Sequence, residues 1–230
     1  MSTQTQPAEK ASRPQPRGVA RSAVTLVVAW AVILGLVVGW GWLLTHPLKS
    51  AVNPWDNDIS RWFADQRTAT LDPLGDDGTL LGETVTGVSV AILAAIGFSL
   101  WRRSWRPALF MALLEAGIGG FYFVATHVDT RQRPPVKILD AGLVPDHSFP
   151  SGHVATAVVA YGGILVLTWV YARSAVRWVA VLGLLPLFVL LARLYQGAHH
   201  LTDVLTSLVY ASVWLLVLAR TLLPLRKDAD

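Results

Sequence analysis

The chain has 230 residues, of which 53% are hydrophobic and only 15% are charged, and its mean hydropathy is +0.47. Soluble domains carry about 25% charged residues, so this composition indicates a membrane protein. The lack of cysteine excludes disulfides, a thiolate nucleophile and cysteine metal sites. The net charge of +4 does not indicate a nucleic-acid-binding protein, because the basic residues stand at the ends of apolar runs, as membrane topology requires.

Six apolar runs are long enough to cross a bilayer core of about 30 Å, which needs about 20 residues of helix. They cover residues 22–44, 83–101, 107–128, 152–172, 177–194 and 201–220. The first run is longer than the core of a signal peptide and ends in GWGWLLTHP instead of a small-residue cleavage site, so we expect a retained transmembrane helix. The predicted fold class is all-α, a polytopic membrane protein with six transmembrane helices.

The remaining segments are predicted to be short. Residues 1–21, rich in Gln, Pro, Ser and Arg, are expected to form a disordered cytoplasmic tail. Residues 22–222 form the six-helix membrane domain, and residues 223–230 form a second cytoplasmic tail. A short interfacial helix is expected at Ile59–Phe63, and Pro186 is expected to kink the fifth and shortest run.

Charged residues between the runs predict the orientation in the membrane. Basic residues cluster before the first run and after the second, fourth and sixth runs. The positive-inside rule places these segments, and therefore both termini, in the cytoplasm. Loops 45–82, 129–151 and 195–200 then face outward, and the three polar clusters of the sequence all fall on that outer face.

These clusters are RQRPP at 131–135, PSGH at 150–153 and HHLTD at 199–203. The first two share one outer loop, and the third opens the last apolar run. Ionisable groups in and beside apolar spans are costly, so by default they indicate function. Together the clusters predict a phosphate-binding site at one membrane face.

PSGH suits the start of a helix. Pro150 is favourable in a first turn. The backbone N–H groups that follow it are unpaired and form an anion site, which Gly152 allows a ligand to approach closely. Ser151 adds a hydroxyl donor and His153 a titratable proton. The alternative is an ordinary helix start with a surface histidine.

HHLTD places His199 and Asp203 four residues apart, on the same side of a helix. A carboxylate in that position can hold an imidazole in one tautomer and make its other nitrogen more nucleophilic. The alternative is a pair on the helix surface, which a carboxylate inside an apolar span disfavours. The neighbouring His200 faces elsewhere on the helix and is expected to be an interfacial, dispensable residue.

Three arginines, Arg131, Arg133 and Arg193, are candidate phosphate ligands, because a guanidinium fork matches phosphate oxygens and keeps its charge. The alternatives are that Arg193 extends from a helix end toward the membrane interface, and that one of the other two arginines only belongs to a basic loop. For Glu115, inside the third run, we favour a structural role as a buried partner or a neutral carboxyl.

With these residues the sequence resembles the type 2 phosphatidic acid phosphatase (PAP2) superfamily, whose signature is KxxxxxxRP, PSGH and SRxxxxxHxxxD. The second part is intact. In the third part Arg193, His199 and Asp203 match, and Ala192 replaces the serine. In the first part Arg133 and its following proline match, and Thr126 stands in place of the lysine.

The resemblance implies a role for each matching residue. His199 is the nucleophile that forms a phosphohistidine, Asp203 orients it, and His153 is the general acid for the leaving alcohol. The family requires no metal, and no cofactor is expected. The phosphoryl oxygens are expected to be held by Arg133, Arg193, Ser151 and Gly152. For the missing lysine there are two alternatives: Arg131 or Lys137 compensates for its charge, or the enzyme is slower or more selective.

We therefore expect an integral membrane lipid phosphatase that acts at the outer face on a lipid phosphate monoester or diphosphate. The sequence does not select among phosphatidic acid, phosphatidylglycerophosphate and isoprenyl phosphates or diphosphates, and it gives no oligomeric state. A phosphotransferase would use the same residues. A metal-binding or transport protein is disfavoured, because the arginines would repel a cation. An inactive lipid-binding relative is disfavoured by the intact histidines.

Overall fold

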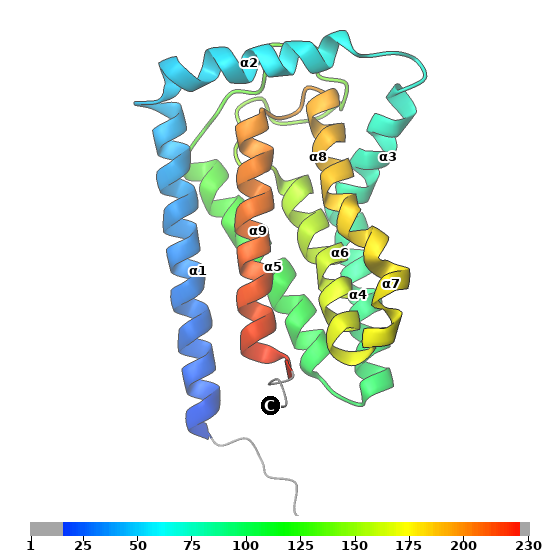
Figure 1. The fold of residues 1–230 in the computed structure, drawn as a ribbon. Coiled ribbons are helices and arrows are strands. Elements are labelled where there is room, and N and C mark those ends of the chain that lie inside the picture. The colour runs from blue at the N-terminus through cyan, green and yellow to red at the C-terminus, as the bar shows by residue number, and fades with distance from the viewer. Residues whose placement is uncertain (1–15, 226–230) are drawn as a thin grey trace, which may run out of the picture.

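A computed structural model of the protein describes residues 16–225, and every regular element in this range is a helix (Figure 1). Six helical segments are long and apolar enough to cross a membrane. The six predicted spans are therefore confirmed, each with ends within a few residues of those expected. The segments are Val19–Thr45, Thr84–Arg102, Arg106–Val128, Gly152–Tyr171, Arg173–Tyr195 and Leu201–Leu222.

The spans run side by side as a bundle, and one helix caps it (Figure 1). The spanning helices are α1 (Pro16–Thr45), α4 (Thr84–Arg102), α5 (Arg106–Val128), α6 (Gly152–Tyr171) and α9 (Leu201–Leu222), together with the last part of the fifth span, α8 (Leu185–Tyr195). Helix α2 (Lys49–Asp65) lies across one end of the bundle, which we call the α2 end, and α3 (Asp72–Gly82) leads from there into α4.

Helix α6 is the central helix of the bundle. It packs against α4, α5, α8 and α9, and 61% of its span is buried, compared with 11% for the spans of α1 and α4. The outer helices expose rows of apolar side chains, such as Val24, Val28 and Leu36 on α1. Apolar surfaces of this extent suit lipid rather than water.

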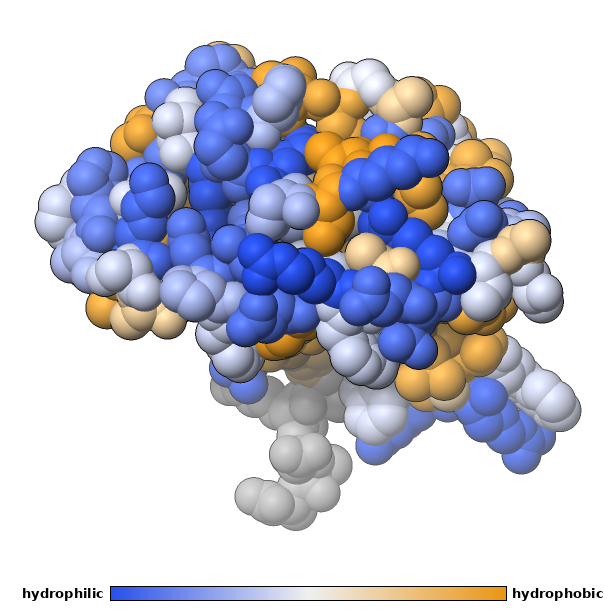
Figure 2. Space-filling model, turned by 90° about the horizontal axis from the view of Figure 1, so that it is seen from above, coloured by the Kyte–Doolittle hydropathy of each residue, from blue (hydrophilic) through white to orange (hydrophobic). Residues whose placement is uncertain are grey.

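The α2 end presents mostly hydrophilic residues in a view along the bundle (Figure 2). Helix α2 is amphipathic across this end: Asp56 and Ser60 are buried, whereas Trp55 and Trp62 are exposed. The predicted interfacial helix at Ile59–Phe63 is thus part of a longer one. Exposed tryptophans at the end of a bundle are typical of the membrane interface.

The fifth span is not one regular helix. It consists of η1 (Arg173–Ala175), α7 (Val176–Val179), η2 (Ala180–Leu184) and α8. Pro186 lies in the first turn of α8, where its missing N–H group would have no helical partner. The break expected at Pro186 is therefore a change from 3₁₀-helix to α-helix just before the proline.

The predicted tails need one correction. Helix α1 begins at Pro16, so residues 16–21 are helical and not part of a disordered tail. The rest of that predicted tail, residues 1–15, lies outside the described residues, as do residues 226–230 of the second tail.

Close packing between α5 and α9 generates a stability prediction. A methyl group at Gly117 would overlap the Trp214 indole, whose Nε1 donates to the Leu113 carbonyl at 3.2 Å. Gly117→Ala should therefore lower the melting temperature in detergent, because overpacking costs about 1–3 kcal/mol. In the matched control Gly97→Ala, no atom outside the local helix lies within 4 Å of the new methyl group. Equal melting temperatures for the two variants would contradict this packing.

Candidate active site

A pocket of about 200 Å³ lies toward the α2 end of the bundle, among α4, α5, α6 and the loops that follow α5 and α8. Arg133, His153 and His199 line it together, as does Gly152. Residues from three separate sequence clusters therefore meet in one cavity, as the sequence predicted.

The PSGH segment forms the start of α6. Ser151 is the N-cap residue, and its backbone N–H donates to Ser207 Oγ on α9 at 2.8 Å. Ser151 Oγ is buried and has no hydrogen-bond partner within residues 16–225. Pro150 precedes the cap instead of occupying the first turn. The unpaired hydroxyl and the free N–H groups of a helix start together suit an anion.

His199 lies in the turn between α8 and α9 and is 4% exposed. Its Nδ1 is 2.6 Å from the Ser148 carbonyl oxygen. A carbonyl oxygen can only accept, so Nδ1 carries the proton and Nε2 keeps its lone pair. Burial, followed by the charges of Arg193 and Arg133, holds the pKa of His199 well below its ordinary value. The imidazole is therefore neutral near pH 7, as a nucleophile must be.

Asp203 does not contact His199 in the way the sequence suggested. Helix α9 begins at Leu201 with His200 as its N-cap, so His199 precedes the helix and the four-residue spacing does not put the two on one helical face. Asp203 instead accepts hydrogen bonds from the His200 backbone N–H at 2.9 Å and Ser148 Oγ at 2.7 Å. Asp203 is linked to His199 through Ser148, whose hydroxyl donates to Asp203 and whose carbonyl accepts from His199 Nδ1.

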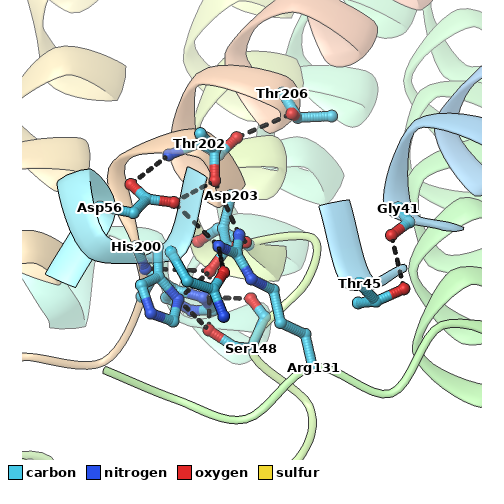
Figure 3. Close-up of polar contacts among 12 residues, drawn as sticks. Gly41, Thr45, Asp56, Arg131, Ser148, His200, Thr202, Asp203 and Thr206 are labelled. Atoms are coloured by element: carbon cyan, nitrogen blue, oxygen red, sulfur yellow. Dashed lines mark hydrogen bonds and ion pairs between the residues drawn. The ribbon is translucent and has the colours of Figure 1, made fainter. Parts of the chain in front are cut away.

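Arg131 is held by two carboxylates (Figure 3). Its Nη1 is 2.5 Å from Asp203 Oδ1, and its Nη2 is 2.9 Å from Asp56 Oδ2 on α2. Thr202 and Asn53 accept further hydrogen bonds from the same fork. Arg131 does not line the pocket of His153 and His199. The expectation that it binds phosphate is therefore not supported by its position.

His200 is buried and hydrogen-bonded, so the expectation that it lies at the membrane interface is wrong. It is 3% exposed, and its Nδ1 lies 3.3 Å from Asp203 Oδ2. Its Nε2 lies 3.1 Å from Asn57 Oδ1 on α2. The reason is its N-cap position, which turns the ring toward α2 instead of the bilayer.

Arg193 is fully buried and does not reach for the interface. It does not itself line the pocket, but its charge acts on both pocket histidines, His153 and His199. Its Nη1 is 2.8 Å from Asp140 Oδ2, 2.9 Å from Thr79 Oγ1 and 3.2 Å from Gln196 Oε1. Its Nε and Nη2 are buried and have no hydrogen-bond partner in the described part of the chain. A guanidinium held by one side of its fork, with the other side unsatisfied, is suited to an oxyanion.

Arg133 binds the loops that shape the pocket. It donates to the carbonyl oxygens of Val144 at 2.9 Å, His147 at 3.1 Å and Ala198 at 2.5 Å. These bonds tie the loop after α5 to the turn that carries His199. Arg133 therefore positions the turn as well as lining the pocket.

The position of the missing lysine lies outside this pocket. Thr126 is buried in the last turn of α5, where its Oγ1 donates to the Tyr122 carbonyl at 2.8 Å. Lys137 is exposed, and its carbonyl accepts from Arg67. Neither residue lines the pocket, so the expectation that Lys137 supplies the missing positive charge there is not supported by its position.

Several residues of the site were not identified from the sequence. Asp56 is one of six aspartates in the segment 56–77, and nothing in that pattern distinguishes it. Ser148 acts through its carbonyl, for which side-chain type gives no signal. The partners of Arg193 come from three separate segments, at Thr79, Asp140 and Gln196.

Metal binding has no support from the described residues: within 16–225 no group of three or more His, Asp or Glu side chains is placed to hold an ion. The charges next to the two pocket histidines are instead those of Arg193 and Arg133.

Comparison with known proteins places the chain in a family. The model of the PAP2 superfamily matches residues 104–227. A solved structure, that of a transmembrane PAP2-type phosphatidylglycerolphosphate phosphatase from Bacillus subtilis, has a similar fold, with a TM-score of 0.65 and 22% identity over 86% of this chain and 92% of that chain. No significant match was found among curated proteins. Since the family match spans more than half of the sequence, the chain belongs to the PAP2 superfamily.

Proposed function

We propose that the protein hydrolyses a lipid phosphate monoester or diphosphate through a phosphohistidine at His199. The observation that carries this proposal is Arg193, which is fully buried and whose Nε and Nη2 have no hydrogen-bond partner in the range 16–225. Its charge acts on both His153 and His199. Leaving a buried guanidinium unsatisfied is costly, and a phosphoryl oxygen would supply the missing acceptors.

In the first step, the Nε2 lone pair of His199 attacks phosphorus and the bond to the lipid oxygen breaks. His153 gives its proton to the leaving alkoxide, which departs as the alcohol. The Ser148 carbonyl keeps the Nδ1–H in place and stabilises the positive charge that develops on the ring. Asp203 acts through Ser148 as a positioning residue.

In the second step, His153 takes a proton from water, and the resulting nucleophile attacks the phosphohistidine. Phosphate leaves, and His199 returns to its neutral form. In both steps the negative charge on the phosphoryl oxygens is stabilised by Arg193 and Arg133, by Ser151 Oγ and by the backbone N–H of Gly152. These donors are held in place before the substrate arrives, which is what makes such stabilisation effective.

We further propose that the α2 end faces outward. The opposite end of the bundle carries the start of α1, the junction of α4 with α5, the α6–α7 turn and the end of α9 (Figure 1). The sequence places arginines at each of these points, including Arg21, Arg102, Arg173 and Arg220. The positive-inside rule supports a cytoplasmic location for that end.

The assignment of the two histidines predicts different mutant behaviour. Purified protein in detergent should release phosphate from a lipid phosphate in the presence of EDTA, and vanadate should inhibit it. His199→Ala should abolish turnover. His153→Ala should lose about 10²–10⁴-fold in kcat/KM on lipid esters and much less in kcat/KM on an activated aryl phosphate. kcat/KM reports the steps up to departure of the leaving group, and the aryl leaving group needs no proton.

His127→Ala serves as the control for these variants, since His127 is exposed and outside the pocket. It should keep wild-type activity. Equal losses of His153→Ala on the lipid ester and on the aryl phosphate would argue against a general acid. Loss of activity in EDTA that zinc or magnesium restores would favour a metal-dependent reaction.

Arg193→Lys tests the unsatisfied side of the guanidinium. Lysine keeps the charge but has no planar fork, so a charge-assisted hydrogen bond worth about 1.5–3 kcal/mol is lost. We expect kcat/KM to fall roughly 10- to 150-fold. Thr126→Lys is the matched control: it adds a cation outside the pocket and should neither raise activity nor rescue Arg193→Lys. An unchanged kcat/KM in Arg193→Lys would exclude it from phosphate binding.

The lowered pKa of His199 predicts the acidic limb of the pH profile. A lowered pKa means that His199 binds a proton only well below pH 6.5 and is a neutral nucleophile above that. Arg133→Gln removes one of the charges that lower it, so the acidic limb of kcat/KM should move to higher pH than in the wild type. Substrate titration is common to both enzymes and cancels in this comparison. A limb that stays in place, or moves to lower pH, would contradict the electrostatic account.

A further inference from the structure

The pocket that contains His153 and His199 continues along α5 toward the middle of the bundle. Its α5 wall consists of Glu115, Ile118, Gly119 and Tyr122, which lie three and four residues apart and so share one face. At about 1.5 Å of rise per residue, Glu115 lies roughly 10 Å farther from the α2 end than Tyr122. The pocket is therefore elongated, with a phosphate end and a deep end.

Residues of α6 and α4 line the pocket on its other sides and extend in the same direction as the α5 wall. Helix α6 lines the pocket with His153 and then, one turn deeper, with Thr156, and α4 contributes Thr84 and then Val88. A lipid whose phosphate lies at His153 and His199 would direct its next atoms down this slot. Those atoms belong to the lipid backbone, before the hydrocarbon tail begins.

Glu115 is the acidic group at the deep end of the slot. Its Oε1 is buried and has no hydrogen-bond partner among residues 16–225. From the sequence, a structural role as a buried partner or a neutral carboxyl is favoured for Glu115, but the described part of the chain provides no partner for Oε1. A carboxyl in a membrane span is costly and is seldom retained without a function.

The slot beside Glu115 is open to a ligand. Gly119, one turn closer to the α2 end, has no side chain, and a methyl group built there would have no atom within 4 Å outside the local helix. The backbone of a bound lipid can therefore pass Gly119 and reach the carboxyl of Glu115 without displacing a side chain there.

We propose that Glu115 is a specificity-determining residue that hydrogen-bonds an oxygen of the lipid backbone next to the phosphate. The substrate class is then a glycerol-based lipid phosphate, whose hydroxyl or ester oxygens follow the phosphate within a few bonds. An isoprenyl phosphate has only hydrocarbon in that place and leaves the carboxyl unpaired. This inference rests on the proposed phosphatase function of the same pocket.

The size of the effect follows from the cost of an unpaired buried polar group. A site built to hydrogen-bond a substrate oxygen rejects an analogue that lacks it. The wild type should therefore prefer a glycerol lipid phosphate over an isoprenyl phosphate, and loss of the hydrogen bond should reduce this preference about 5- to 150-fold.

The test compares kcat/KM for lysophosphatidic acid and farnesyl phosphate in the same detergent, by released phosphate. The ratio of the two values does not depend on the fraction of active enzyme. In Glu115→Leu and Glu115→Met, two apolar changes of similar size, the ratio should fall toward that of an unselective enzyme. In Glu115→Gln, which keeps hydrogen-bonding atoms, most of the preference should remain.

Thr168→Val is the matched control: it replaces a buried polar side chain of α6 that bonds only to the Ile164 carbonyl, outside the pocket. Its ratio should equal that of the wild type. An unchanged ratio in both apolar variants, an equal fall in Glu115→Gln, or a wild-type preference for farnesyl phosphate would each overturn the role of Glu115. If the wild type releases phosphate from neither lipid, the proposed phosphatase function itself fails.

Discussion

The arrangement of the site depends on one buried cation, Arg131, held between Asp56 and Asp203. All three side chains are at most 4% exposed. Buried charges are stable only when paired and fully hydrogen-bonded, and removing one partner costs about 3–5 kcal/mol. Neutral donors satisfy both carboxylates further. Asp203 accepts from Ser148 Oγ and the His200 backbone N–H, and Asp56 accepts from the backbone N–H and the hydroxyl of Thr202. The cluster therefore fixes where α2, the loop after α5 and the start of α9 meet.

The geometry of His199, the proposed nucleophile, follows from that cluster. Asp203 holds the Ser148 hydroxyl, and the Ser148 carbonyl accepts from His199 Nδ1. One turn along α9, Ser207 Oγ accepts from the Ser151 backbone N–H and so sets the start of α6. Two sequence motifs are thus connected through a few short bonds to one ion pair. A mutation of Asp56, far from the pocket in sequence, would disturb the position of His199 through this path.

The sequence predicted the parts of the fold that depend on local properties. Hydropathy over about 20 residues determined the six spans, since a helix that crosses lipid must be apolar along its whole length. The meeting of PSGH with His199 also followed from topology, because charges at the ends of the spans put their loops on one face. The roles of Arg131, His200 and Asp203 could not be predicted in this way. They depend on where α9 begins and on α2 lying across the bundle, and both are tertiary features.

Glu115 and Arg193 also show what the sequence alone could not predict. For Glu115 the sequence indicates only a costly charge within an apolar run, and for Arg193 it predicts a phosphate ligand without indicating which of its atoms are available. What distinguishes them is which atoms remain without partners after folding: Nε and Nη2 of Arg193 at the phosphate end and Oε1 of Glu115 at the deep end. A substrate with a phosphate at one end and backbone oxygens farther in would satisfy both.

The most direct test of this account is to trap the covalent intermediate. His153→Ala should react with an activated aryl phosphate, whose leaving group needs no proton, and then hydrolyse slowly because no base activates water. Quenching during turnover, followed by peptide mass spectrometry, should find an acid-labile, base-stable phosphate on His199. Phosphate on Ser151 or on another residue, or no covalent phosphate during active turnover, would contradict a mechanism centred on His199.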